Sequence, residues 1–253
     1  LRMASLVSTN QSAFIAGRGV HDNFLLVQQT ARLLHSLKAL RILLKLDIAR
    51  AFDRVSWPFL LETLSHLGFG RRWCAWICML LSTASPRVLV NGNPGPPIQH
   101  EQGLCQGDPV SPMLFATVID TLNNLLQHAI SNGVLQWLTT RNAASSISLF
   151  TYDVVLFCHP DPAELRTIHE LLDTFGNASG LRTSFAKCSA TPIRCPPEML
   201  LGIASTLYCP IKHFPIKYLG LPLSVRKASS SDLMPLLDKL LLKLATWKAA
   251  LLN

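Results

Sequence analysis

Acidic residues and long apolar runs are both scarce in this sequence, which has only 15 Asp and Glu among its 253 residues. The longest uncharged apolar run extends from Trp73 to Leu81. That is about half of the roughly 20 residues that a membrane-spanning helix needs, so the sequence predicts no transmembrane segment. The chain also lacks a starting methionine and the charged-then-apolar pattern of a secretory signal. We therefore expect a fragment of a longer protein.

Paired cysteines are also missing. The seven cysteines form no CxxC pair, and no histidine stands at a zinc-ligand spacing from them. An odd number of cysteines without such spacing indicates neither a disulfide framework nor a zinc site. A reducing, intracellular setting is the simplest interpretation.

Apolar residues and positive charge are plentiful. The hydrophobic fraction of 49% is enough for a continuous core, which favours a globular chain over a disordered one. The formal net charge is +8, and the basic residues are scattered rather than gathered in a tail. A folded basic surface favours polyanionic partners such as nucleic acid.

Hydrophobic periodicity predicts a mixture of helices and strands. Helical spacing occupies residues 21–40, 57–68, 72–84, 113–130, 161–179 and 231–252. Ser56 is placed to cap the second of these helices, and Gly180 to end the fifth. Strands are expected over 42–48, in two hairpins over 86–99 and 147–157, and over 190–193 and 216–219. The sequence therefore predicts a chain that contains both helices and strands.

Two carboxylates occupy positions that otherwise belong to a sheet interior. Asp47 ends the first apolar strand, and Asp153 lies near the tip of the second hairpin. An unpaired buried carboxylate costs several kcal/mol, so each needs a partner. Lys45 shares a strand face with Asp47, whereas no basic residue lies within a strand's reach of Asp153. Either a divalent cation bridges both groups, or Asp47 pairs with Lys45 and Asp153 occupies a solvated turn.

A family resemblance is carried by six segments in order along the chain. They are NQSAFIAGRGVHDN, KLDIARAFDRVSW, QGDPVSPMLF, LFTYDVVLF, FGNASGLRTSFAKC and KYLGLPLS. Their order and spacing resemble the reverse transcriptases of non-LTR retrotransposons, most closely the LINE elements of plant genomes. The resemblance covers nearly the whole sequence, which makes it far more specific than any single motif.

The resemblance implies an α+β, right-hand polymerase fold, and the order of the expected helices and strands is compatible with it. Residues 1–223 would form interleaved fingers and palm, with a small antiparallel palm sheet backed by helices. Residues 224–253 would begin a thumb that is cut short. The implied partners are an RNA template, a DNA primer and deoxynucleoside triphosphates, with no membrane, and the implied location is the nucleus.

The resemblance also implies the chemistry of the two carboxylates. Asp47 and Asp153 match catalytic, metal-binding residues that hold two Mg²⁺ ions, or Mn²⁺ in their place, about 4 Å apart. These ions stabilise the attack of a primer 3′-hydroxyl on a nucleotide's α-phosphate. Lys187 matches a lysine that protonates the pyrophosphate leaving group, although an exposed lysine without a role is the commoner use of this residue.

Other positions match substrate-binding residues of the family. The resemblance implies nucleotide binding by Phe52, Gln106 and Gly107, primer grip by Tyr218, Leu219 and Gly220, and a phosphate contact by Arg18. Phe52 would lie beneath the incoming sugar and exclude a 2′-hydroxyl. The alternatives are an ordinary core phenylalanine for Phe52 and a plain helix-entry loop for Gln106 and Gly107.

The sequence departs from the family at a metal-binding position. Tyr152 stands where the family has the first aspartate of an acidic pair. A phenol with a pKa of about 10 stays neutral at pH 7 and is a poor ligand for Mg²⁺. We do not expect Asp53 to substitute for it. Gln102 and Cys105 replace arginines that plant relatives carry, which removes positive charge beside the substrate loop.

These observations predict a reverse transcriptase domain with impaired catalysis. A non-catalytic remnant that binds nucleic acid is the first alternative. A relic without any selected role is the second. Loss of a metal ligand, at about 4 kcal/mol, would lower the rate roughly a thousandfold.

Overall fold

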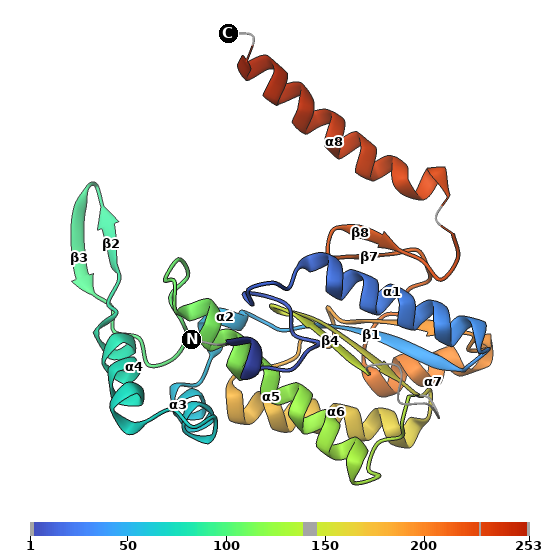
Figure 1. Ribbon diagram of the computed structural model, residues 1–253, viewed down its shortest axis with the longest axis horizontal. Coiled ribbons are helices and arrows are strands. Elements are labelled where there is room, and N and C mark those ends of the chain that lie inside the picture. The colour runs from blue at the N-terminus through green and yellow to red at the C-terminus, as the bar shows by residue number, and fades with distance from the viewer. Residues whose placement is uncertain (1–2, 139–145, 228, 252–253) are drawn as a thin grey trace.

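The computed structural model describes residues 3–138, 146–227 and 229–251 (Figure 1). Its helices are α1 (Val20–Ser36), α2 (Ala51–Arg54), α3 (Trp57–His66), α4 (Arg71–Thr83), α5 (Ser111–Ser131), α6 (Pro162–Ser179), α7 (Pro197–Leu207) and α8 (Ser230–Leu251), with a 3₁₀ turn at Met3–Ser5. Its strands are β1 (Arg41–Asp47), β2 (Arg87–Val90), β3 (Asn93–Pro97), β4 (Ile147–Phe150), β5 (Asp153–Cys158), β6 (Ser189–Ile193), β7 (Ile216–Tyr218) and β8 (Leu221–Leu223). The predicted α+β fold is confirmed. Residue 252, the expected end of the last helix, lies outside the described residues.

A four-stranded sheet in the order β4-β5-β1-β6 forms the centre of the molecule. All of its neighbouring strands are antiparallel. Successive side chains of a strand point to opposite faces, so β1 and β5 each contribute to two separate apolar layers. The expected small antiparallel sheet backed by helices is therefore present.

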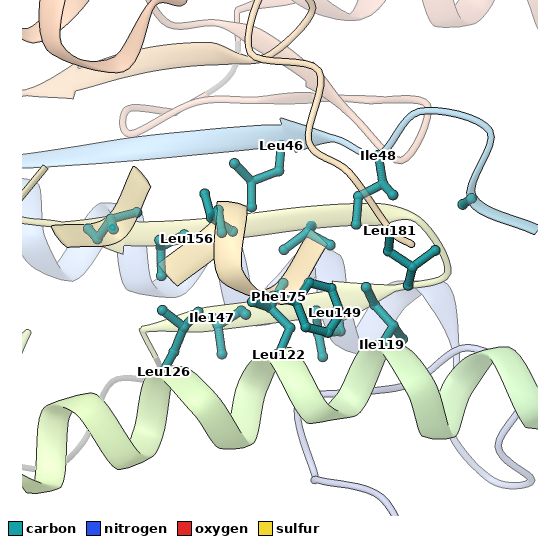
Figure 2. Close-up of a cluster of buried hydrophobic side chains, with 14 of the residues drawn as sticks. Leu46, Ile48, Ile119, Leu122, Leu126, Ile147, Leu149, Leu156, Phe175 and Leu181 are labelled. Atoms are coloured by element: carbon teal, nitrogen blue, oxygen red, sulfur yellow. The ribbon is translucent and has the colours of Figure 1, made fainter. Parts of the chain in front are cut away.

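One face of the sheet packs on α5 and α6 (Figure 2). Leu46 and Leu156 from the central strands are buried in the same cluster as Leu122 and Leu126 of α5 and Phe175 of α6. The hairpin β4–β5 adds Ile147 and Leu149 to this cluster. Burial of these large side chains supplies most of the stabilisation that holds the strands in register.

The opposite face of the sheet packs on α1 and on the small hairpin β7–β8 (Figure 1). Leu43 and Val155 meet Val27 of α1 and Tyr218 of β7 in this second cluster. Towards the end of β1, this apolar face gives way to Lys45 and Asp47. The polar end of the face is therefore bordered by the β7–β8 hairpin.

The helix boundaries follow the predicted caps. The hydroxyl of Ser56 accepts the backbone N–H of Phe59 at 3.4 Å, which caps α3. The carboxylate of Asp161 accepts the N–H of Glu164 at 3.0 Å, which caps α6, and Gly180 ends that helix. Side-chain acceptors of this kind satisfy the free N–H groups of a first helical turn.

The 3₁₀ turn at Met3–Ser5, helix α7 and strand β8 were not predicted from the sequence. Helix α7 contacts α6, and strand β8 completes the hairpin with β7. Two segments extend away from the rest of the molecule in Figure 1: the β2–β3 hairpin and α8. The latter coincides with the segment expected to begin a thumb. Within the described residues, no helix combines the length and apolarity that membrane crossing requires.

Candidate active site

The two carboxylates singled out in the sequence are direct neighbours across β1 and β5. Asp47 is the last residue of β1, Asp153 is the first residue of β5, and the two are register partners. Directly opposed residues of an antiparallel pair point to the same face, with Cβ atoms about 5 Å apart. The register therefore places Asp47 and Asp153 side by side at two adjacent strand ends, and their role as a metal site stays a prediction.

Lys45 pairs with Asp153, which corrects two sequence-based expectations. Its Nζ lies 3.6 Å from Oδ1 of Asp153, and both side chains are about one-third exposed, at 32% and 30%. We expected no basic residue near Asp153, and we considered Lys45 a partner for Asp47. Both were wrong because the β1–β5 register places Asp153 diagonally opposite Lys45, within reach of a long side chain.

The backbone of Asp47 is fixed by the segment that precedes β6. Its carbonyl accepts the N–H of Ser184 at 2.8 Å, and its own N–H donates to Sγ of Cys188 at 3.3 Å. Burial raises the pKa of the Cys188 thiol to about 12, so this sulfur stays protonated and neutral beside the carboxylate. Lys187 is exposed in the same turn, which places it near the strand end without a fixed contact to either aspartate.

The tip of the β4–β5 hairpin is a two-residue turn of Thr151 and Tyr152, closed by the Phe150–Asp153 pair. Thr151 has a φ of 53°, an uncommon backbone conformation for a β-branched residue. The side chain of Tyr152 is 53% exposed. The turn therefore presents a phenol to solvent immediately before Asp153.

The loop that carries Gln106 and Gly107 is anchored on the segment that follows β1. The N–H of Gly103 donates to the carbonyl of Val55 at 2.8 Å, and the N–H of Leu104 donates to the carbonyl of Phe52 at 2.7 Å. Trp57 adds a hydrogen bond from Nε1 to the carbonyl of Gly103 at 2.7 Å. The loop position is therefore tied to the same strand end that presents Asp47.

Gln106 and Gly107 themselves are exposed. Phe52 is half-buried and stacks on Phe115 of α5, with ring centroids 4.5 Å apart. This contact gives Phe52 a packing function in the core cluster. Its exclusion of a 2′-hydroxyl stays a prediction.

A cavity of about 700 Å³ lies between α3, α4 and this loop. Apolar side chains such as Leu81 and Leu114 line it together with Gln106 and Asp53. From the side of the helices, this cavity extends to the loop that is expected to bind a nucleotide.

The β7–β8 hairpin borders the carboxylates on the other side. Tyr218 is fully buried, stacks near Phe24 at a centroid distance of 6.4 Å, and lies 3.4 Å from the hydroxyl of Ser148. Burial, with a smaller contribution from the charge of Asp153, raises the pKa of Tyr218 to about 12. The side chain of Tyr218 is part of the core and Leu219 is half-buried against it, so Gly220 is the exposed residue of the expected primer grip.

A second cavity, of about 620 Å³, joins this hairpin to the carboxylate site. Asp153, Leu219 and Gly220 line it together with basic side chains: Lys45, Lys212, His213 and Lys217. This cluster is not evident in the sequence, because its members come from β1, β7 and the loop before β7. Only the pairing of these segments brings them together.

Arg18 contacts the chain itself. Its guanidinium donates to the backbone carbonyls of Ser8 and Gln11, each at 2.6 Å, and of Ala4 at 3.0 Å. These bonds fix the N-terminal segment. A phosphate contact by Arg18 stays a prediction.

Residues 1–223 match the family model described as "Reverse transcriptase (RNA-dependent DNA polymerase)". This chain belongs to the reverse transcriptase family. The division of this range into fingers and palm stays a prediction.

Relatives of this reverse transcriptase chain include two proteins of transposable elements. It is 26% identical over 254 aligned residues to the "Transposon TX1 uncharacterized 149 kDa protein" of Xenopus laevis, covering 97% of this chain and 18% of the relative. It is 26% identical over 245 residues to the "Retrovirus-related Pol polyprotein from type-2 retrotransposable element R2DM" of Drosophila melanogaster, covering 91% of this chain and 22% of the relative. The chain thus spans about a fifth of the length of these relatives.

Solved telomerase structures share the fold. A telomerase from Candida tropicalis, in complex with a fragment of telomeric RNA, aligns with a TM-score of 0.62 over 90% of this chain and 36% of that chain, at 12% identity. A telomerase from Candida albicans gives a TM-score of 0.52 over 68% of this chain and 30% of that chain, at 14% identity. The polymerase fold expected for a reverse transcriptase is therefore shown.

The donor set of this reverse transcriptase chain fits one divalent cation better than two. Asp47 and Asp153 present carboxylates on one face of the sheet, and Tyr152 adds no carboxylate from the adjoining turn. Within the described ranges, no three His, Cys, Asp or Glu side chains gather closely enough to hold a metal. Two carboxylates with water ligands suit a single Mg²⁺ ion.

Proposed function

We propose that this chain is the reverse transcriptase domain of a LINE-type, non-LTR retrotransposon of a plant genome, with RNA-directed DNA polymerase chemistry weakened by the loss of a metal ligand. The observation that carries the proposal is the register pairing of Asp47 with Asp153 at the ends of adjacent strands. The substrates would be a primed RNA template and deoxynucleoside triphosphates, and the place of action the nucleus.

The proposed site divides its tasks among separate elements. Asp47 and Asp153 would hold Mg²⁺ or Mn²⁺, which supplies electrostatic stabilisation of the phosphoryl oxygens during nucleotidyl transfer. Lys187 would donate a proton to the pyrophosphate leaving group from the turn beside Asp47. That turn is hydrogen-bonded to the backbone of Asp47. The hydrogen bond would keep Lys187 close to the end of β1.

Substrate binding would use the two cavities that adjoin the strand ends. Phe52, Gln106 and Gly107 would bind the incoming nucleotide from the loop anchored on the end of β1. On the other side, the turn of Leu219 and Gly220 would hold the primer backbone, with Tyr218 fixing the hairpin from within the core. Arg18 would contact a phosphate in the fingers by giving up one or more of its hydrogen bonds to backbone carbonyls in exchange for bonds to phosphate oxygens.

Tyr152 is the reason we expect weak activity. A phenol adjoins Asp153 where the family has a carboxylate, and the loss of one ionic ligand at about 4 kcal/mol corresponds to roughly a thousandfold lower rate. The decay of a transposon copy would explain this substitution together with Gln102 and Cys105.

A second candidate function is binding of nucleic acid without catalysis. The cavity beside Asp153 favours it, because three lysines and a histidine line that cavity with a single carboxylate. Such a surface attracts a phosphate backbone whether or not a metal is bound.

Primer extension separates the two functions. The chain and an Asp47→Asn variant are compared on a primed RNA template with Mg²⁺ and with Mn²⁺. Incorporation by the chain above that of the variant supports the polymerase. Equal incorporation, together with template binding that weakens steeply as salt rises, supports the binding function instead.

A further inference from the structure

The amine of Lys45 lies beside the carboxylate pair. Lys45 and Asp47 are two residues apart on β1 and therefore share a face. Asp153 stands directly opposite Asp47, and its Oδ1 is 3.6 Å from the Lys45 Nζ. A cation that approaches Asp153 from this face meets an ammonium group already in contact with it.

The charge balance of the neighbourhood strengthens this effect. The cavity between Asp153 and the β7–β8 hairpin is lined by Lys45, Lys212 and Lys217, and Asp153 is the one carboxylate among its lining residues. Tyr152, in the turn before Asp153, adds no carboxylate to this neighbourhood. Like charges within about 4 Å repel appreciably even in partly solvated surroundings, so Lys45 opposes a divalent cation more strongly than the other lysines of the cavity.

We propose that Lys45 occupies the cation position at the carboxylate pair and competes with a divalent metal for Asp153. This inference deepens the proposed function, since it takes Asp47 and Asp153 as the metal-binding groups. Metal binding is then weak for two separable reasons: the carboxylate missing at Tyr152 and the resident ammonium of Lys45. Removing the ammonium alone strengthens metal binding, even while Tyr152 remains.

Mn²⁺ titration followed by the paramagnetic resonance of free Mn²⁺ measures this competition without any turnover. The chain is compared with Lys45→Met and Lys45→Arg. We expect Lys45→Met to bind Mn²⁺ about tenfold more tightly, since an adjacent positive charge and an ion pair are both removed. Lys45→Arg keeps the charge and stays within about threefold of the chain.

Lys217→Met is the matched control, because it removes the same charge from the same cavity and leaves the Lys45–Asp153 pair intact. We expect less than about threefold tightening from it. Circular dichroism verifies that each variant is folded, and Lys45→Gln replaces Lys45→Met if the apolar side chain prevents folding.

Three results would overturn the inference. Lys45→Met could bind Mn²⁺ no more tightly than the unmodified chain, Lys217→Met could tighten binding as much as Lys45→Met does, or both the unmodified chain and Lys45→Met could fail to bind Mn²⁺. Asp47→Asn distinguishes this failure from that of the proposed function. If the chain and Lys45→Met bind equally and both lose Mn²⁺ with Asp47→Asn, the carboxylate site stands and only the role of Lys45 is wrong. If Asp47→Asn leaves Mn²⁺ bound, the proposed metal site fails as well.

Discussion

Gly103 is the point where the loop carrying Gln106 and Gly107 touches the segment after β1. Its φ is 87°, and a Cβ at this position would lie 2.7 Å from the carbonyl oxygen of Asp53 and 2.9 Å from its carbonyl carbon. Both atoms belong to the backbone, so a rotamer change cannot relieve the contact. Gly103→Ala must therefore shift the loop or the α2 backbone.

Gly107 provides a control within the same loop. Its φ is 94°, yet no atom lies within 4 Å of the point where a Cβ would stand. An alanine in the left-handed region costs about 1 kcal/mol in either position. The effect of alanine on the unfolded chain is also common to both. The difference between the two variants therefore isolates the steric contact.

We expect Gly103→Ala to lower the free energy of unfolding by about 3 kcal/mol, since overpacking adds about 2 kcal/mol to the backbone term. Gly107→Ala should lower it by only about 1 kcal/mol. Urea denaturation followed by circular dichroism gives both values, with unchanged m-values as the sign that the unfolded states are comparable. Equal destabilisation by the two substitutions would refute the proposed anchoring of the loop.

Two further predictions concern titratable groups. Burial raises the pKa of Asp120 above its ordinary value of 3.8, against hydrogen bonds from Ser8, so its contribution to stability is full below pH 3.8 and is lost as the pH rises through the raised pKa. In urea titrations, the free energy of unfolding of Asp120→Asn should therefore rise relative to that of the unmodified chain as the pH goes from 3.5 to 7. A difference between the two free energies that stays constant over this range would contradict the prediction. Burial raises the pKa of the Cys209 thiol to about 11 and that of the Cys188 thiol to about 12. At pH 8 a maleimide or disulfide reagent should therefore label the exposed Cys78 and Cys105 at least about a hundredfold faster than it labels Cys188 and Cys209. Similar rates at all four cysteines in the folded chain would count against the buried placement of Cys188 and Cys209.

Local signals predicted much of the fold. The cap at Ser56, the stop at Gly180 and the alternation around Asp153 are short-range features, and each element they delimit was found. Helix α7 was missed because Pro196 and Pro197 suggest a loop, although Ile203 and Leu207 repeat with helical spacing and are buried. Pro197 in fact occupies the first position of α7, where a missing N–H costs little.

The candidate site was predictable where one strand end defines it, and not where several segments meet. Asp47 and Asp153 are each visible in the sequence because they interrupt an apolar strand. The partner of Lys45 depends on the register between β1 and β5, which the sequence around Lys45 does not specify. The burial of Tyr218 likewise depends on α1 covering the β7–β8 hairpin, a contact between distant parts of the chain.

Restoration of the missing carboxylate tests the central claim most directly. Tyr152→Asp is compared with the chain in single-turnover primer extension with Mn²⁺, at a primed-template concentration that saturates binding. If Asp47 and Asp153 form a polymerase site weakened mainly at Tyr152, incorporation should rise by about a thousandfold, and Asp47→Asn in the same background should abolish it. A Tyr152→Asp protein that is folded, binds the template and incorporates no more nucleotide than the chain would contradict the account.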